Sequence, residues 1–115
     1  MADRLLLATS LRDDYEVLAR DDGSYVVAAI DRNGTRHEDR VGAEVADWLR
    51  ERLRGRTVDK DEAAEVLAPA AERLALPFTY GRKLGFHAQK VLLVLVARGE
   101  AGFEKHGRRF IYTVY

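Results

Sequence analysis

The sequence contains no cysteine among its 115 residues. That absence excludes a disulfide framework, a zinc site built on thiolates and a cysteine nucleophile. Long hydrophobic runs are also missing: the most apolar segment, residues 91–97, has seven residues, whereas a membrane-spanning helix needs about 20. The opening segment MADRLLLATSLRDD has only a short leucine run and an acid in its would-be basic region, which does not fit a signal peptide. We therefore expect a cytoplasmic protein with no membrane partner.

Catalytic motifs are absent as well. The sequence has no Gly-rich phosphate loop, no GxSxG elbow and no nucleotide-binding fingerprint. The histidines, His37, His87 and His106, lie far apart, and the segment HED at residues 37–39 lacks the HExxH spacing of a helical zinc site. No grouping of nucleophile, base and orienting residue is visible. We predict a protein without cofactor, metal ion or enzymatic activity.

The composition is that of a folded chain. Hydrophobic residues make up 47% and charged residues 33% of the sequence, a balance that disordered chains do not have. A length of 115 residues is enough to bury a core without disulfides or a metal ion. We predict a single domain spanning residues 1–115.

An excess of charge of one sign is also missing, because 19 Lys and Arg balance 19 Asp and Glu. The charges are nevertheless divided unevenly. Residues 1–78 hold 12 basic and 17 acidic residues, whereas residues 79–115 hold 7 basic and 2 acidic residues. An acidic body with a basic end indicates a polyanionic partner. The alternative is chance clustering of charges on a solvated face.

The first 40 residues have the pattern of an antiparallel β-meander. Residues 15–20 alternate as on a half-buried strand, and residues 24–31 are apolar on both faces, which predicts a central strand. Asp21-Asp22-Gly23 predicts a turn. Asn33-Gly34 predicts a hairpin with a type I′ turn, which needs positive φ at both positions. The polar segment that follows suits an exposed edge strand.

Two helices are expected next. Hydrophobic residues recur at helical spacing over residues 41–53, and Gly55 is a natural stop. A second helix is expected to begin at Asp59, which forms a capping-box pattern with Glu62. Pro69 lies inside the apolar pattern of this helix, so we expect a kink or a break there.

The apolar run at residues 91–97 fits a buried strand or a buried helix. We favour a helix over about residues 84–98, because one apolar face persists over four turns and Gly99 supplies a C-cap. Gly85 weakens this helix by about 1 kcal/mol relative to alanine.

The remaining residues predict a hairpin, with strands over 103–105 and 109–115 joined by a turn at 105–108. The alternation places Phe110, Tyr112 and Val114 toward the core. Trp48, Phe86 and Phe103 are also expected to be core residues. The predicted fold class is therefore α+β: an N-terminal antiparallel β-meander over residues 1–40, then about three helices and a C-terminal β-hairpin over residues 41–115.

Two segments of the C-terminal part resemble the winged helix-turn-helix superfamily. TVDKDEAAEVL, at residues 57–67, is similar to the second helix of such domains, which has a capped start just after a tiny strand. VLLVLVARGEAGFEKHGRRFIYTV, at residues 91–114, is similar to the end of a third helix running into a basic wing. The likeness covers about two-thirds of the chain and leaves the meander as an unassigned addition.

The resemblance implies a partner, double-stranded DNA, and a role as a transcriptional regulator or accessory DNA-binding factor. The start of a recognition helix reads base edges, and the wing contacts the backbone or minor groove. In this sequence the implied helix residues are Arg82, Lys83, His87, Gln89 and Lys90. The implied wing residues are Lys105, Arg108 and Arg109, which would contact phosphates.

Other interpretations stay open from the sequence alone. The basic wing residues also suit the solubility of an edge hairpin. A non-enzymatic protein-interaction or dimerisation module on the same scaffold is the main alternative. If a homodimer forms, the first strand and the helix that carries Trp48 are the expected contacts.

Overall fold

The computed structural model describes residues 3–115, and its fold is α+β. Four strands come first, β1 (Arg4–Ser10), β2 (Asp14–Ala19), β3 (Tyr25–Ile30) and β4 (Arg36–Val41). The middle of the chain forms α1 (Ala43–Leu53), β5 (Thr57–Val58), α2 (Lys60–Leu67) and the 3-10 turn η1 (Ala68–Ala70). The chain continues with α3 (Gly81–Ala97), β6 (Ala101–His106) and β7 (Arg109–Val114). The predicted arrangement of meander, three helices and hairpin is confirmed, whereas the sequence pattern did not single out β1.

The meander is an antiparallel sheet in the order β1-β2-β3-β4. Its inner face follows the alternation expected of a half-buried sheet, with Tyr15 and Val17 of β2 and Val27 of β3 buried. β4 is an edge strand, as predicted from its polar sequence. A bulge between Leu5 and Leu7 shifts the register of β1 against β2.

The β3–β4 turn is not the predicted type I′ turn. Gly34 takes a positive φ of 80°, but Asn33 does not. The reason is the side chain of Asp31, which accepts hydrogen bonds from the backbone N–H of Asn33 at 2.9 Å and of Thr35 at 3.0 Å. An aspartate that bonds backbone groups two and four residues ahead stabilises an ordinary turn, so only Gly34 needs the left-handed conformation.

The helices α1 and α2 begin and end close to where the sequence predicts. Gly55 follows α1 with a positive φ of 78°. The capping box of α2 is formed: the Glu62 N–H donates to Asp59 at 2.8 Å, and the Asp59 N–H donates to Glu62 at 3.1 Å. The chain passes from α-helix to a 3-10 turn at Pro69, which confirms the predicted break.

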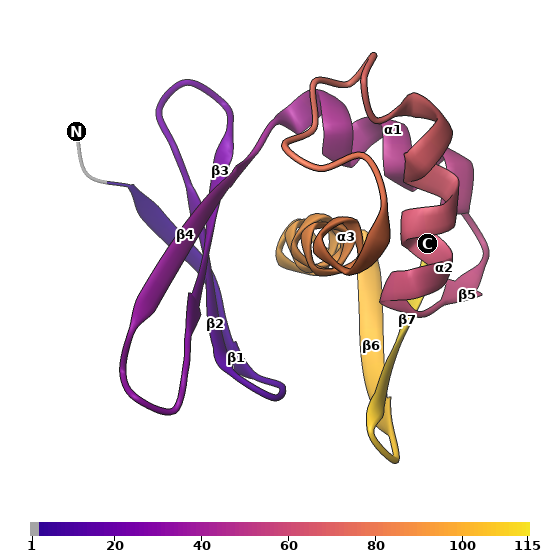
Figure 1. The fold of residues 1–115 in the computed structure, drawn as a ribbon. Coiled ribbons are helices and arrows are strands. Elements are labelled where there is room, and N and C mark those ends of the chain that lie inside the picture. Colours follow the sequence, from indigo (N-terminus) through magenta and orange to yellow (C-terminus); the bar gives the residue numbers. More distant parts are fainter. Residues whose placement is uncertain (1–2) are drawn as a thin grey trace.

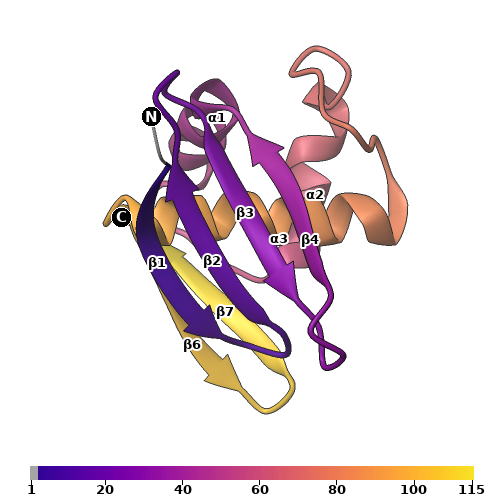
Figure 2. The same ribbon diagram turned by 90° about the vertical axis from the view of Figure 1, so that its left-hand side faces the viewer.

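The segment over residues 91–97 is helical, and α3 lies in the middle of the molecule. Figure 1 shows α3 end-on between the meander and the layer that contains α1, α2 and the C-terminal hairpin. Figure 2 shows the same helix crossing behind the meander. All five residues from Val91 to Leu95 have no exposed surface. A helix buried on every side needs a layer on each flank, and the meander supplies the second one.

The C-terminal hairpin belongs to a second sheet with the order β5-β7-β6. The short strand β5 therefore joins the wing-like hairpin instead of standing alone. Tyr112 and Val114 of β7 are fully buried and Phe110 is partly buried, as the predicted alternation requires. Gly107 turns the hairpin with a positive φ of 63°.

One hydrophobic cluster runs through both parts of the chain. It contains Tyr15, Val17 and Val27 from the meander together with Leu49 of α1 and Leu92 of α3. The prediction that Phe86 is a core residue is wrong. Phe86 is 47% exposed, and the Lys60 ammonium lies 5.0 Å from its ring centre. No helix within residues 3–115 combines the length and apolar character needed to cross a bilayer.

Candidate nucleic-acid interface

The residues predicted to enter a DNA groove lie in the first half of α3, and the structure divides them into two groups. Arg82 and Lys83, in the first turn, are exposed. His87 and Gln89 are buried, with 3% and 6% of their surface exposed. Because both side chains are buried, they are not presented to a DNA groove, contrary to the expectation of a free recognition helix.

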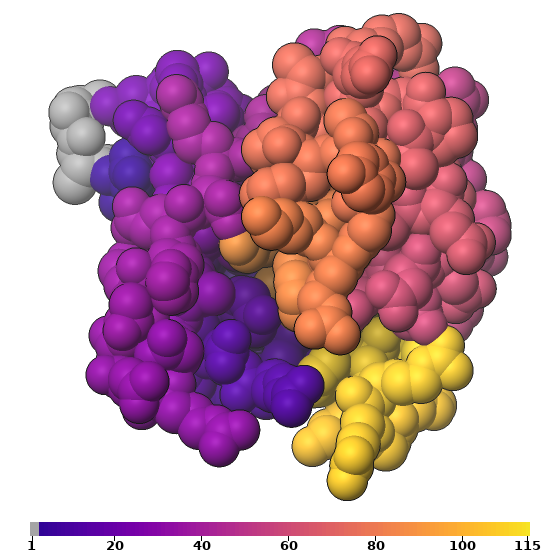
Figure 3. All heavy atoms as spheres, in the orientation of Figure 1, coloured from indigo at the N-terminus to yellow at the C-terminus, as the bar shows by residue number. Residues whose placement is uncertain are grey.

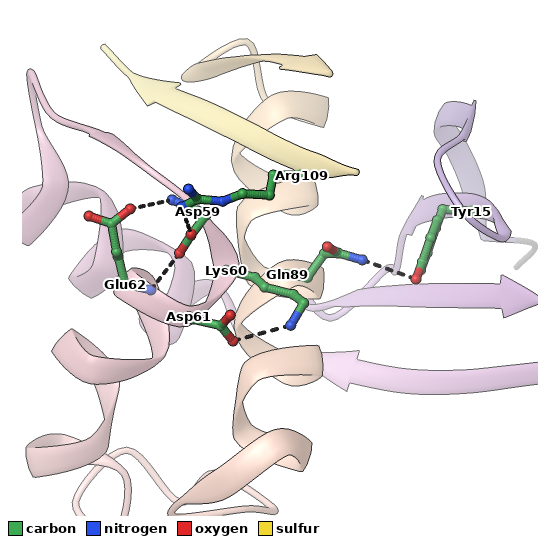
Figure 4. Close-up of polar contacts among 7 residues, drawn as sticks. All are labelled: Tyr15, Asp59, Lys60, Asp61, Glu62, Gln89 and Arg109. Carbon is green, nitrogen blue, oxygen red and sulfur yellow. Dashed lines mark hydrogen bonds and ion pairs between the residues drawn. The ribbon is translucent and has the colours of Figure 1, made fainter. Parts of the chain in front are cut away.

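Gln89 is held by the meander. Its side-chain amide donates to the Tyr15 hydroxyl of β2 at 3.1 Å (Figure 4). Burial raises the pKa of Tyr15, partly offset by this hydrogen bond. Burial also raises the pKa of the nearby Tyr112, whose hydroxyl has no hydrogen-bond partner within residues 3–115. Gln89 therefore acts as a polar contact inside the protein and does not present its amide to an adenine edge.

Lys90 is occupied in the same way, because its ammonium forms an ion pair with Asp39 of β4. Beside this pair, burial lowers the pKa of His87, with Asp39 raising it and Lys90 lowering it further. His87 is therefore neutral at pH 7. Of the residues predicted to read bases, Gln89 and Lys90 instead hold the meander on α3, and His87 is buried with its ring against Phe78.

The residues predicted to form a wing are also divided. Arg109 forms an ion pair with Asp59, the N-cap of α2, so its guanidinium ties the hairpin to the helix (Figure 4). His106 Nε2 lies 3.1 Å from Glu104 Oε2 on the same hairpin. Lys105 and Arg108 are exposed, and neither forms an ion pair within residues 3–115.

A third cation, Arg12, joins these two from the other end of the chain. Arg12 lies in the β1–β2 turn, where the Leu11 N–H donates to the Asp13 carbonyl at 3.0 Å. A hollow of about 420 Å³ separates this turn from the hairpin tip, and Arg12, Lys105 and Arg108 all line it. We call these three residues the wing cluster. Sequence reasoning missed Arg12, because a single arginine in a turn carries no signal of what it will approach.

The Asp59 contact gives a testable stability prediction. Asp59→Ala is expected to destabilise the protein by about 1 kcal/mol at pH 7, because the N-cap of α2 is lost. The pKa of Asp59 is lowered: burial raises it, but hydrogen bonds from the Glu62 N–H and from Arg109 outweigh that effect. The contribution is therefore present above the unfolded pKa of about 4 and is lost as the pH falls through the lower folded pKa. Urea unfolding of both proteins between pH 7 and pH 2 measures it.

Asp59→Asn is the matched variant for that measurement. Asparagine also caps helices, but it carries no charge for Arg109. The loss of stability in Asp59→Asn should therefore be smaller than the loss in Asp59→Ala. A deficit of Asp59→Ala that stays constant down to pH 2 would contradict the role given to the carboxylate.

Within residues 3–115, no group of three or more His, Asp or Glu side chains is placed to hold a metal ion. Comparison with known proteins gives no relative: no protein-family model, curated protein or solved structure matches the chain.

Proposed function

We propose that the protein is a non-enzymatic DNA-binding protein of winged-helix type that contacts the duplex backbone through its hairpin. The observation that carries the proposal is the wing cluster. Arg12, Lys105 and Arg108 come from two segments far apart in sequence, converge on one hollow, and have no acidic partner within residues 3–115. Cations left without acidic partners in one place favour a polyanionic ligand.

The arrangement of elements supports the winged-helix assignment. The order α1-β5-α2-α3-β6-β7 follows the resemblance found in the sequence, and β5 pairs with β7 of the hairpin. Because His87 and Gln89 are buried, we infer that binding relies on phosphate contacts and has little sequence preference. A cytoplasmic regulator or accessory factor that holds DNA without reading much of its sequence fits this inference.

The salt dependence of duplex binding tests the proposal. Three phosphate contacts should make the logarithm of the binding constant fall with the logarithm of salt concentration with a slope of roughly −3. Replacing Arg12, Lys105 and Arg108 together by alanine should remove most of this slope and weaken binding. Fluorescence anisotropy of a labelled duplex, measured at salt concentrations from about 50 to about 200 mM, gives both the binding constant and its salt slope.

The matched control is the double variant Arg82→Ala plus Lys83→Ala, which removes two exposed cations at the start of α3. It should bind duplex DNA as the original chain does. Absence of binding at low salt, or an equal loss in the control variant, would overturn the wing cluster as the contact.

A homodimer remains a prediction. The first strand predicted from the sequence, residues 15–20, corresponds to β2, which pairs with β1 and β3 and offers no free edge. Trp48 of α1 is only partly buried, with Arg52 and Arg73 near its ring. Of the two expected contacts, the helix that carries Trp48 is the one left available. Light scattering is expected to give twice the chain mass of 13.0 kDa, and a value equal to that mass would contradict the dimer.

A further inference from the structure

The first turns of α3 extend past the edge of the meander. In Figure 2 the helix emerges beyond β4, and Figure 3 shows the molecule hollowed between β4 in magenta and the start of α3 in orange. This hollow has a volume of about 550 Å³. We call it the β4 groove. Its lining residues used below are Arg36, Asp39, Phe78, Lys83, Phe86 and His87.

One wall of the β4 groove is an unpaired strand edge. β4 has β3 on one side and no strand on the other within residues 3–115. In an antiparallel ladder, alternate residues direct their N–H and C=O groups away from the paired strand. Half of the six residues of β4 therefore offer backbone donors and acceptors toward the groove. Such an edge is a template for an added strand.

The opposite wall is apolar and carries one positive charge without a carboxylate partner. Phe86 is 47% exposed and Phe78 is partly buried. Lys83 is exposed, and its ammonium lies 5.6 Å from the Phe78 ring centre without an ion pair within the described chain. Arg36 and Lys90, in contrast, form ion pairs: Arg36 with Glu16 and Glu38, and Lys90 with Asp39.

His87 is a buried polar residue on the wall of the groove. The residue is 3% exposed, lines the groove, and its Nδ1 atom has no hydrogen-bond partner within residues 3–115. A buried nitrogen left without a partner costs about 1–3 kcal/mol.

We propose that the β4 groove binds an extended segment of a partner protein, which adds a fifth strand to the meander beside β4. The backbone of the segment pairs with β4. An apolar side chain of the segment packs on Phe78 and Phe86, and a carboxylate pairs with Lys83. The added strand covers the turns of α3 that β4 does not reach, as β2 and β3 cover the turns that follow.

Charge complementarity fixes the chemistry of the segment. Among the side chains that line the groove, Arg36, Lys83 and Lys90 are cations and Glu38 and Asp39 are anions, which leaves a net charge of +1. Lys83 is the cation without an ion pair within residues 3–115, so an acidic side chain is favoured beside it and a basic one is repelled. Strand pairing requires that the segment contain no proline at positions that donate to β4. The expected sequence therefore alternates apolar and acidic residues without a central proline.

A displayed library of random peptides about ten residues long, enough to span one strand, is the probe. Selected on the intact chain, the enriched peptides should alternate apolar and acidic residues. Their affinity should fall roughly tenfold or more for Lys83→Glu and for Phe86→Ser, both exposed positions where folding is preserved. Lys105→Glu, an exposed lysine on the hairpin, is the matched control and should bind the peptides unchanged.

Hydrogen exchange of the chain with one selected peptide gives the second readout. Strand addition should protect backbone amides of β4 that exchange freely in the isolated protein. Three outcomes overturn the proposal: no enriched peptide, equal binding by Lys83→Glu and Phe86→Ser, or protection confined to another strand, including the edge of β1. Self-association of the protein through β4 in the absence of peptide, seen as an increase in its mass in solution, would assign this edge to a second copy of the chain. That result would also overturn the proposal.

The result is independent of DNA binding. Lys105→Glu alters the wing cluster but not the β4 groove, and Lys83→Glu does the reverse. Failure of either proposal therefore leaves the other measurable on the same set of variants.

Discussion

Removing residues 1–40 is expected to abolish the cooperative folding of the remaining chain. The meander covers one flank of α3, where Val91 to Leu95 have no exposed surface. Without it, an apolar helix face would meet water, and each fully buried leucine or valine is worth about 1.5–3 kcal/mol. Several such losses match the whole stability of a small domain, about 5–15 kcal/mol. Circular dichroism and thermal unfolding of the truncated chain measure the result.

A chain that begins at Arg4 is the control for that truncation, because it keeps all four strands of the meander. It should melt as the full sequence does. A truncated chain of residues 41–115 that melts cooperatively would show two independent domains, against the predicted single domain. If it also bound duplex DNA more tightly, the meander would be a cover over a reading helix.

The predictability of α3 shows what a sequence pattern can supply. The apolar face and the glycine after the helix correctly predicted a helix instead of a strand. The unbroken apolar run also implied burial on more than one side, but it could not say what lies on the second side. Helical spacing fixes how residues sit relative to one another on the helix, whereas the covering layer depends on how the whole chain folds back.

That missing layer explains the errors among the predicted site residues. His87 and Gln89 are polar and were expected on a free surface, yet both are buried, Gln89 against the meander and His87 beside Phe78. Phe86 is apolar and was assigned to the core, yet it lies where α3 passes beyond β4. A polar residue with a buried partner, such as Gln89 with Tyr15, looks the same in sequence as an exposed one.

Glycine 85 illustrates the same limit from the opposite direction. From the sequence, Gly85 only weakened the helix. In the structure, a β-carbon at this position would lie 3.1 Å from a carboxylate oxygen of Asp61 in α2, so the glycine leaves room for that exposed side chain. The cost of glycine to the helix, about 1 kcal/mol, can be predicted from the sequence. The closeness of Asp61 cannot, because it depends on how α2 packs beside α3.

Replacing Leu93 by alanine is expected to destabilise the protein by about 2–5 kcal/mol. Leu93 lies one turn after Gln89 and Lys90, which contact β2 and β4, so it shares their side of α3. It has no exposed surface. The substitution removes buried methyl groups and leaves a cavity between the helix and the meander. Urea unfolding at pH 7 measures the change, which is a large part of the total stability.

Leu5→Ala is the same chemical change at a leucine that is 54% exposed on the edge strand β1. Its effect should stay within about 0.5–1 kcal/mol, because exposed positions lose little contact. The difference between the two variants isolates the burial of the meander-facing side of α3. A loss below about 1 kcal/mol for Leu93→Ala, close to that of Leu5→Ala, would mean that this side of α3 is not packed. The helix would then be open to bind a ligand, and the assignment of base reading to His87 and Gln89 would stand again. A large difference, together with loss of folding on removal of the meander, would leave the hairpin tip and the β4 groove as the surfaces through which the protein acts.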